Sequence, residues 1–334
     1  MISIGFIFQI LGSLANFIIY CFNDDVYTWK LQSVLNRLGK SLFLDIINPL
    51  PEYPEGYNWT LEQQIRNRGY QFERHEIQTE DDYILTAFRI PGKLGEENKQ
   101  RNKYPIFMQH GLIDMSGTWF FNKKEKSLAF QLSDQGYDVW MTNSRGTVPS
   151  NKHMKYTIKD HQFWDFTVHE MALYDVPANL KYILDKTKAT QVIYIGHSQG
   201  TTQWFLANIL DKDLTQYFKV FVGVAPVMSV NHMTSFLSQT LDAMNAAAIA
   251  SEVSDSILYA PNIASFGSTL THYLPRTLPM MSRNDVGGTS TKNLLFWNQM
   301  IHEKRLGYFN YGEKENMKRY NQTQPPDYDV QEIQ

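Results

Sequence analysis

The stretch Gln191-Val-Ile-Tyr-Ile-Gly-His-Ser-Gln-Gly-Thr-Thr-Gln-Trp-Phe205 indicates how the rest of the chain is organised. Its first part, Gln191 to Ile195, is apolar and rich in β-branched residues, which is typical of a buried strand. A helical pattern begins at Thr201, so a sharp turn must join the two. Gly196 and Gly200 flank this turn and let the strand and the helix approach closely, because a Cβ atom would obstruct them.

Ser198 lies at the centre of this turn, in the pattern G-x-S-x-G. So short a pattern also occurs by chance, but its place between a strand and a helix is what a nucleophile elbow requires. We therefore predict that Ser198 is a catalytic nucleophile rather than a structural turn serine. The adjacent His197 should project in a different direction. We expect it to have a packing role, and the general base to come from elsewhere in the chain.

Strand-like and helical segments alternate on both sides of this turn. In chain order they are a strand at 104–109, a helix at 126–135, a strand at 137–142, a helical stretch at 168–184, the strand at 191–195 and a strand at 220–224. This repeated order predicts an α/β fold with a parallel sheet covered by helices on both faces. Pro177 falls inside the second helical stretch and should kink or restart it.

The segment before the alternating region predicts a short helix and a hairpin. Thr60-Leu-Glu-Gln63 matches a capping box and should open a helix at 61–65. Two strand-like runs, 74–79 and 83–90, flank the acidic turn Glu80-Asp-Asp82, which is typical of a β-hairpin.

The pattern changes again after Val224. From about 228 to 285, short amphipathic pieces alternate with turn signals, which we interpret as an inserted helical cap. The pattern does not distinguish a lid from an ordinary helical subdomain. The predicted organisation is an apolar leader at 1–22, an N-terminal segment at 23–47, the sheet core at 48–227, the cap at 228–285 and a return to the core at 286–334.

Composition excludes several classes of function. The chain has 334 residues, of which 43% are hydrophobic, so it can bury a sizeable core. A net charge of −3 and a pI of about 6.3 give no basic field, which argues against a nucleic-acid partner. The single cysteine, Cys21, excludes an internal disulfide framework. No spacing indicates a metal cluster or a phosphate loop, so no cofactor is predicted.

The N-terminus indicates a place in the secretory pathway. Residues 4–22 are almost wholly apolar and uncharged. We interpret them as a cleaved signal peptide, with a retained membrane anchor as the alternative. Either would place the domain in the lumen of an organelle or outside the cell, as a secreted or lysosomal protein. Two glycosylation sequons, at Asn58 and Asn321, agree with this location.

Several further motifs, taken together and in order, resemble the acid lipases, the family of gastric lipase and lysosomal acid lipase within the α/β-hydrolases. The matching stretches include Thr79-Glu-Asp-Asp-Tyr-Ile-Leu85, Gln109-His-Gly-Leu112, Gly136-Tyr-Asp-Val-Trp140, Asn143-Ser-Arg-Gly146, Gly196–Thr202, Gly287-Gly-Thr-Ser290 and Gln324-Pro-Pro326.

This resemblance implies an α/β-hydrolase fold and hydrolysis of neutral lipid esters, triacylglycerols or sterol esters, at a lipid–water interface. In the family a Ser–His–Asp triad works through an acyl-enzyme beneath a lid. Ser198 matches the nucleophile, and Gln199 and Leu112 match the residues whose backbone N–H groups form the oxyanion hole. His110 and Arg145 also lie in matching motifs. We expect both to have structural roles.

The resemblance does not extend to the other two triad members. In the family, Asp and His follow the Pro-Pro segment, which here is Gln324-Pro-Pro326, and no later residue of this sequence matches them. Asp327 and Asp329 come too early to be substitutes, and His272 and His302 fall in or beside the cap. Two hypotheses remain: a lipase whose C-terminal part is not in this sequence, or a non-catalytic lipid-binding relative. For residues 1–334 alone we expect poor solubility and almost no activity.

Overall fold

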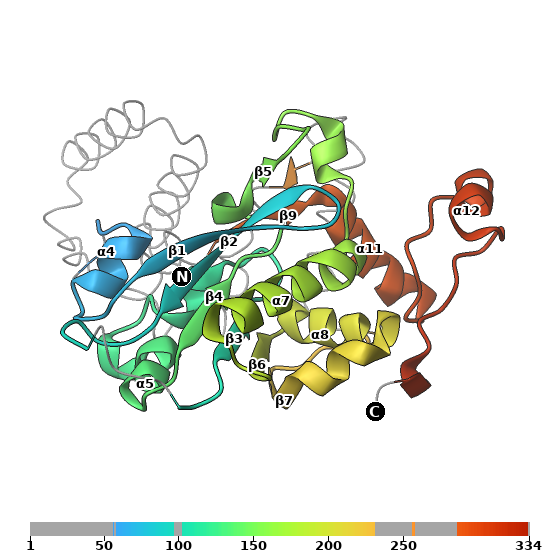
Figure 1. Ribbon diagram of the computed structural model, residues 1–334. Helices are drawn as coiled ribbons and strands as arrows, with labels where there is room; N and C mark the ends of the chain where they lie inside the picture. The colour runs from blue at the N-terminus through green and yellow to red at the C-terminus, as the bar shows by residue number, and fades with distance from the viewer. Residues whose placement is uncertain (1–55, 57, 97–101, 231–255, 258–285, 333–334) are drawn as a thin grey trace, which may run out of the picture.

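The computed structural model describes residues 56, 58–96, 102–230, 256–257 and 286–332, with a mixed β-sheet at the centre (Figure 1). The strand order is β1-β2-β4-β3-β6-β7, and β5 pairs with β2. The strands are β1 (Glu73–Gln78), β2 (Tyr83–Ile90), β3 (Ile106–Gln109), β4 (Val139–Thr142), β5 (Lys152–His153), β6 (Val192–His197) and β7 (Phe218–Val224).

The four strands β4, β3, β6 and β7 are parallel, as the alternating pattern predicts. Strands β1 and β2 form the predicted antiparallel hairpin, and β2 continues antiparallel to β4. Because the parallel strands all end at the same edge of the sheet, the segments that follow β3, β4 and β6 meet there. Ser198 and the loop after β3 therefore lie close together.

Helices cover both faces of the sheet and form two hydrophobic cores. The helices are α4 (Leu61–Arg66), α5 (Leu128–Asp134), α6 (Val168–Glu170), α7 (Val176–Thr187), α8 (Gln199–Leu210), α11 (Thr291–Glu303) and α12 (Glu313–Tyr320). Ile106 and Met108 of β3 pack in one core with residues of α4 and α5. Phe107, between them, points to the opposite face and packs in the other core with residues of α7 and α8.

Short 3₁₀ helices connect several of these elements. They are η1 (Ser116–Trp119), η2 (Lys124–Lys126), η3 (Val148–Ser150), η4 (His161–Trp164), η6 (Lys212–Tyr217) and η8 (Val330–Glu332). A separate two-stranded ladder pairs β8 (Ser256–Ile257) with β9 (Thr289–Ser290). Helix α12 lies apart from the sheet, in red in Figure 1.

Two helix boundaries confirm predictions made from the sequence. Thr60 caps α4: its Oγ1 accepts a hydrogen bond from the Gln63 N–H, and the Gln63 side chain accepts one from the Thr60 N–H. The helical stretch around Pro177 is divided into α6, a π-helical turn η5 (Met171–Asp175) and α7. Pro177 lies in the first turn of α7, directly after the π-helical turn, and the backbone stays helical from that turn into α7.

Strand β7 forms one edge of the sheet among the described residues. On one face Phe221 stacks against Trp204 of α8, with ring centroids 4.2 Å apart. On the other face Val220, Val222 and Val224 are 46%, 40% and 41% exposed. A parallel strand is normally covered on both faces, so this valine row is unusual.

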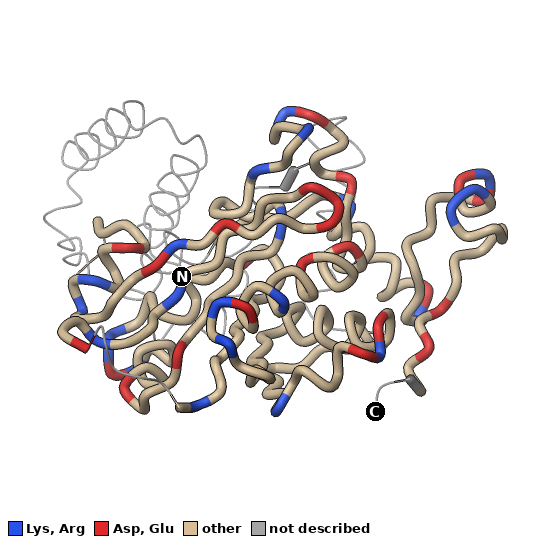
Figure 2. The backbone as a smooth tube through the Cα atoms, viewed as in Figure 1, with Lys and Arg blue, Asp and Glu red and all other residues tan. Residues whose placement is uncertain are grey.

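Several predictions fall on residues that the structure does not describe. The leader at 1–22, the segment at 23–47 and most of the cap at 228–285 lie outside the described residues. Within the described ranges, no helix combines the length and apolar character needed to cross a membrane. Lys and Arg residues are interspersed with Asp and Glu residues along the backbone (Figure 2).

Candidate active site around Ser198

Ser198 occupies the predicted turn between β6 and α8, in a strained backbone conformation. Its φ is 49° and its ψ is −118°. Positive φ is uncommon for a residue with a side chain, and such strain is typical of functional sites. The turn is held from both sides: the Ser198 N–H donates to the Val224 carbonyl at 3.0 Å, and the Ser198 carbonyl accepts from the Thr201 N–H at 2.9 Å.

The two flanking glycines permit this turn. A Cβ atom on Gly200 would lie 2.4 Å from the carbonyl oxygen of Gln109, and one on Gly196 would lie 2.9 Å from the carbonyl of Gly200. Both distances are shorter than real Cβ contacts. The start of α8 therefore lies directly against the end of β3. This close packing brings the residue after Ser198 next to the loop that follows β3.

The loop that follows β3 passes beside Ser198. A Cβ atom on Gly111 would lie 3.2 Å from the Ser198 Cβ. Asp114 fixes this loop, since its carboxylate accepts hydrogen bonds from the N–H groups of Gly111 at 3.2 Å and Met115 at 2.8 Å. Leu112 follows Gly111 and packs against the hydrophobic core. The loop is thus adjacent to the serine, as an oxyanion hole requires.

Gln199 is the first residue of α8, so its N–H belongs to the end of the helix where backbone donors have no partner within the helix. The helix dipole also favours negative charge at this end. The Gln199 side chain is 2% exposed. Its Oε1 accepts hydrogen bonds from Asn293 Nδ2 at 2.9 Å and Trp297 Nε1 at 2.7 Å, both on α11.

His110 is buried between the loop after β3 and the end of β4. Its Nε2 accepts a hydrogen bond from the Ser144 N–H at 3.0 Å, so Nδ1 carries the proton and donates to the Gly111 carbonyl at 2.9 Å. Burial lowers the pKa of His110 to about 4, because the charged ring would be desolvated. Both ring nitrogens therefore bind backbone groups, which agrees with the expected role in shaping this loop.

His197 precedes Ser198 and faces the same loop. Its Nδ1 lies 3.5 Å from Asp114 Oδ2, and its ring meets that of Trp119 edge-on. The side chain is 38% exposed. These contacts place His197 against the loop after β3 and agree with the packing role expected for it.

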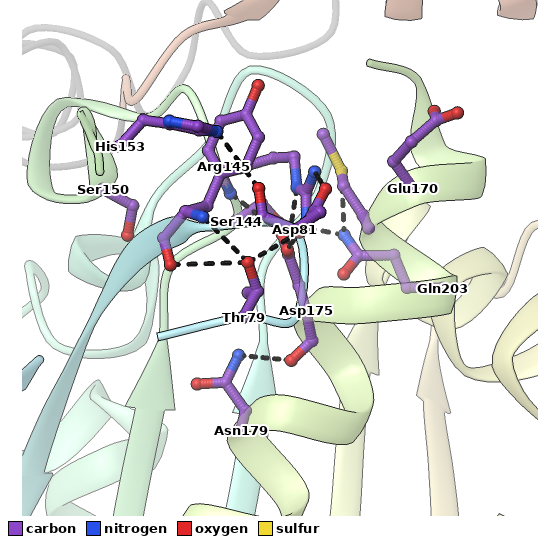
Figure 3. A network of polar contacts seen from close by, with 12 residues as sticks. Thr79, Asp81, Ser144, Arg145, Ser150, His153, Glu170, Asp175, Asn179 and Gln203 are labelled. Atoms are coloured by element: carbon purple, nitrogen blue, oxygen red, sulfur yellow. Dashed lines mark hydrogen bonds and ion pairs between the residues drawn. The ribbon is translucent and has the colours of Figure 1, made fainter. Parts of the chain in front are cut away.

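Arg145 is the centre of a buried ionic network (Figure 3). Its guanidinium group, 1% exposed, binds Asp175 of the π-helical turn and Asp81 of the β1–β2 turn. It also lies 4.0 Å from the centroid of the Tyr83 ring. Burial raises the pKa of Asp175 to about 6, although Arg145 acts in the opposite direction. Arg145 thus ties three segments together, in line with its predicted structural role.

A chain of hydrogen-bonded, buried side chains connects the elements around the Ser198 turn. The sequence motifs do not reveal it. Ser144 Oγ accepts hydrogen bonds from Gln109 Nε2 at 2.9 Å and from Gln203 Nε2 at 3.0 Å. The sulfur of Met171 then accepts from Gln203 and from Gln199. This chain links the ends of β3 and β4 to α8 and the π-helical turn.

The candidate substitutes for a general base and a triad acid have other partners or lie elsewhere. Asp327 forms an ion pair with Arg305 at 2.5 Å, and Asp329 accepts a hydrogen bond from the Gln331 N–H. His302 is exposed near the end of α11, and His272 lies outside the described residues. Four further histidines bind groups away from the serine hydroxyl: His75, His110, His153 and His169.

Comparison with known proteins agrees with this fold. A family model described as a partial alpha/beta-hydrolase lipase region matches residues 61–123, and the model of the alpha/beta hydrolase fold matches residues 104–312.

Curated relatives match along most of the chain. A putative lysosomal acid lipase/cholesteryl ester hydrolase of Crotalus adamanteus is 37% identical over 80% of this chain and 72% of that protein. Lipase member K of Homo sapiens is 34% identical over 83% of this chain and 75% of its own length. Gastric triacylglycerol lipase of Rattus norvegicus is 34% identical over 84% and 77%, respectively.

Proposed function

Because this chain belongs to the acid lipase family of the α/β-hydrolases, a family of ester hydrolases, we propose that it cleaves neutral lipid esters with Ser198 as the nucleophile. The substrate class follows from its relatives, whose names specify triacylglycerols and cholesteryl esters. The observation that carries the proposal is the backbone of Ser198, whose φ of 49° places a serine at a strained turn between a parallel strand and a helix.

The proposed reaction proceeds through an acyl-enzyme. Ser198 Oγ loses its proton to a base and attacks the ester carbonyl carbon, which gives a tetrahedral intermediate. The backbone N–H groups of Gln199 and Leu112 stabilise its oxyanion, and one such donor contributes about 2.7–4 kcal/mol in related sites. The C–O bond to the alcohol then breaks, and the leaving oxygen takes up the proton. Water attacks the acyl-enzyme in the same way and releases the fatty acid.

The base and its orienting acid are the open parts of this scheme. A serine hydroxyl is a weak nucleophile until a base removes its proton, and no position of this sequence matches the family's Asp or His. We therefore expect residues 1–334 alone to be nearly inert, since loss of triad members lowers turnover by roughly 10⁴ to 10⁶ in well-studied serine hydrolases. The alternative is a protein that binds lipid esters in the same site without cleaving them.

We place this activity outside the cytosol, in a lysosome or in the secreted fluid. Its support is the apolar leader at 4–22 together with the exposed sequon asparagines, Asn58 and Asn321. Relatives described as lysosomal or gastric lipases agree with such a location.

The test is to assay the whole encoded protein, with any in-frame residues that follow Gln334, on p-nitrophenyl butyrate, triolein and cholesteryl oleate. Hydrolysis that Ser198→Ala abolishes supports the proposal. Ser133→Ala, which alters a buried serine in α5, serves as the matched control and should leave the rate unchanged.

Two outcomes would contradict the proposal. Hydrolysis that persists in Ser198→Ala would exclude this nucleophile. Binding of a fluorescent lipid ester without turnover, equal in the wild type and Ser198→Ala, would favour the non-catalytic alternative. Reading the coding sequence beyond Gln334 separates the two hypotheses independently, because a continuation with Asp followed by His favours the enzyme.

A further inference from the structure

One segment, residues 286–297, contacts both sides of the oxyanion hole proposed above. It contains β9 and the first half of α11. At its beginning, the N–H groups of Gly287 and Gly288 donate to the carbonyl of Ile113, at 2.8 and 3.2 Å. Ile113 directly follows Leu112, so these bonds hold the carboxyl side of the residue that should supply one oxyanion donor.

The contact at Gly287 requires glycine. A Cβ atom there would lie 2.3 Å from the carbonyl oxygen of Asp114 and 2.8 Å from the Met115 Cβ. Val286 and Asp114 also form an isolated antiparallel bridge. The segment therefore packs backbone against backbone on the loop after β3, with no room for a side chain between them.

At its other end, the same segment holds the second donor residue. Asn293 Nδ2 and Trp297 Nε1 both donate to Gln199 Oε1, and all three side chains are buried. Asn293 is itself fixed, because its Nδ2 also donates to Thr289 Oγ1 at 3.0 Å. Its N–H donates to the helix-capping Ser290 Oγ, also at 3.0 Å.

We propose that residues 286–297 position the two backbone donors of the oxyanion hole, with Trp297, Asn293 and Gly287 as positioning residues. This inference rests on the proposed function. An oxyanion hole works because its donors are fixed before the negative charge develops. The Gln199 N–H belongs to the first residue of a helix, where fraying is easiest. A buried side-chain amide with two donors on another helix restrains that residue.

The first test compares Trp297→Phe with Trp164→Phe. The two tryptophans are 5% and 6% exposed. Their Nε1 atoms donate to Gln199 Oε1 at 2.7 Å and to the Ile158 carbonyl at 2.8 Å, respectively. Each substitution thus removes one hydrogen bond of a buried indole ring and keeps a large aromatic ring. The bond of Trp297 is buried and that of Trp164 is half-buried, and only Trp297 contacts the residue after Ser198.

Amide hydrogen exchange of the whole encoded protein measures how firmly the backbone around each donor is held. It does not require the protein to be active. We expect Trp297→Phe to speed exchange in a peptide covering residues 198–205, and Trp164→Phe to leave this peptide unchanged. Gly287→Ala, as a second variant, should speed exchange in a peptide covering 110–116. Equal exchange in wild type and Trp297→Phe, or equal acceleration in both tryptophan variants, would overturn the inference.

Kinetics provide the second readout where the wild type turns over substrate. Trp297→Phe should lower kcat by about 10- to 100-fold with little change in KM, since donors displaced by a fraction of an ångström weaken the transition state rather than substrate binding. Trp164→Phe should leave both constants near the wild-type values. A change confined to KM would contradict positioning. A wild type that does not hydrolyse the substrate would contradict the proposed function. The exchange experiment would still decide this inference, because it needs no activity.

Discussion

Arg145 and Asp175 form an ion pair that is shielded from solvent: Nη2 lies 2.7 Å from Oδ1, and each side chain is 1% exposed. The pair joins the end of β4 to the π-helical turn between α6 and α7. Asp81, 27% exposed, binds the other side of the guanidinium group and adds the β1–β2 turn. One buried guanidinium group, shared by two carboxylates, therefore holds together three segments near the serine.

We predict that Arg145→Leu destabilises the fold by about 3–5 kcal/mol, since removal of one partner leaves Asp175 as an uncompensated buried charge. Burial already raises the pKa of Asp175 to about 6, so the folded state binds this proton more readily than the unfolded state. The Asp175 contribution is therefore favourable below the unfolded pKa and is lost as pH rises through about 6. The variant should lose more stability at pH 8 than at pH 5.

Urea unfolding of wild type and variant at the two pH values measures this difference. Arg66→Leu is the control, because Arg66 is 45% exposed and pairs with Glu62 on the surface of α4. It should change the unfolding free energy by about 1 kcal/mol or less. A loss in Arg145→Leu that does not depend on pH would show that Asp175 does not titrate in this range.

His110 should make stability fall in acid. Its folded pKa is lowered to about 4 by burial, against about 6.5 in an unfolded chain. Between these values the unfolded state binds the extra proton, so stability decreases as pH falls, by about 3 kcal/mol over the full titration. We expect His110→Gln to be less stable at pH 7 but to show a shallower decline between pH 6.5 and 4. Unfolding free energies measured across this interval test it, and parallel curves would contradict it.

The local features of the fold are predictable from the sequence because they depend on neighbouring residues. The glycines around Ser198, the capping box at Thr60 and the restart at Pro177 each act within a few positions of the chain. The predicted boundaries near the serine were slightly wrong. Strand β6 continues to His197 and α8 begins at Gln199, because Ser198 alone makes the turn.

The contacts that hold the candidate site could not be predicted in this way. Gln199 and Trp297 are 98 positions apart, and Arg145 and Asp81 are 64 apart. Hydrogen bonds over such separations depend on how helices and strands pack, which leaves no periodic signal in the sequence. The polarity of Gln199 was visible, but its partners on α11 were not.

Gly200→Ala should destabilise the protein, although alanine is normally the better helix former. The added Cβ would lie 2.4 Å from the Gln109 carbonyl and 2.7 Å from that of His110, and backbone cannot move as easily as a side chain. We expect a loss of about 1–3 kcal/mol, measured by thermal or urea unfolding. Stabilisation by this substitution would show that α8 can move away from β3 without strain.

Both sequons should carry glycans when the protein is made in secretory cells. Asn58 and Asn321 are exposed, and Asn321 ends α12 with a φ of 56°, a conformation that asparagine tolerates. Asn58→Gln and Thr323→Ala should each remove one step in gel mobility that a deglycosylating enzyme also removes. Thr323→Ala preserves Asn321, and Asn58→Gln preserves the cap formed by Thr60. Unchanged mobility in either variant would show that its sequon is unused.

The valine row of β7 should limit solubility of residues 1–334 expressed alone. Among the described residues β7 pairs with β6 only, and an open strand edge beside exposed valines favours association between chains. Val222→Lys places a charge in this row and should raise the soluble fraction and lower light scattering. Val330→Lys is the matched control, since Val330 is 47% exposed outside the sheet. An equal gain from both variants would indicate a general effect of added charge, and no gain from Val222→Lys would show that association does not involve β7.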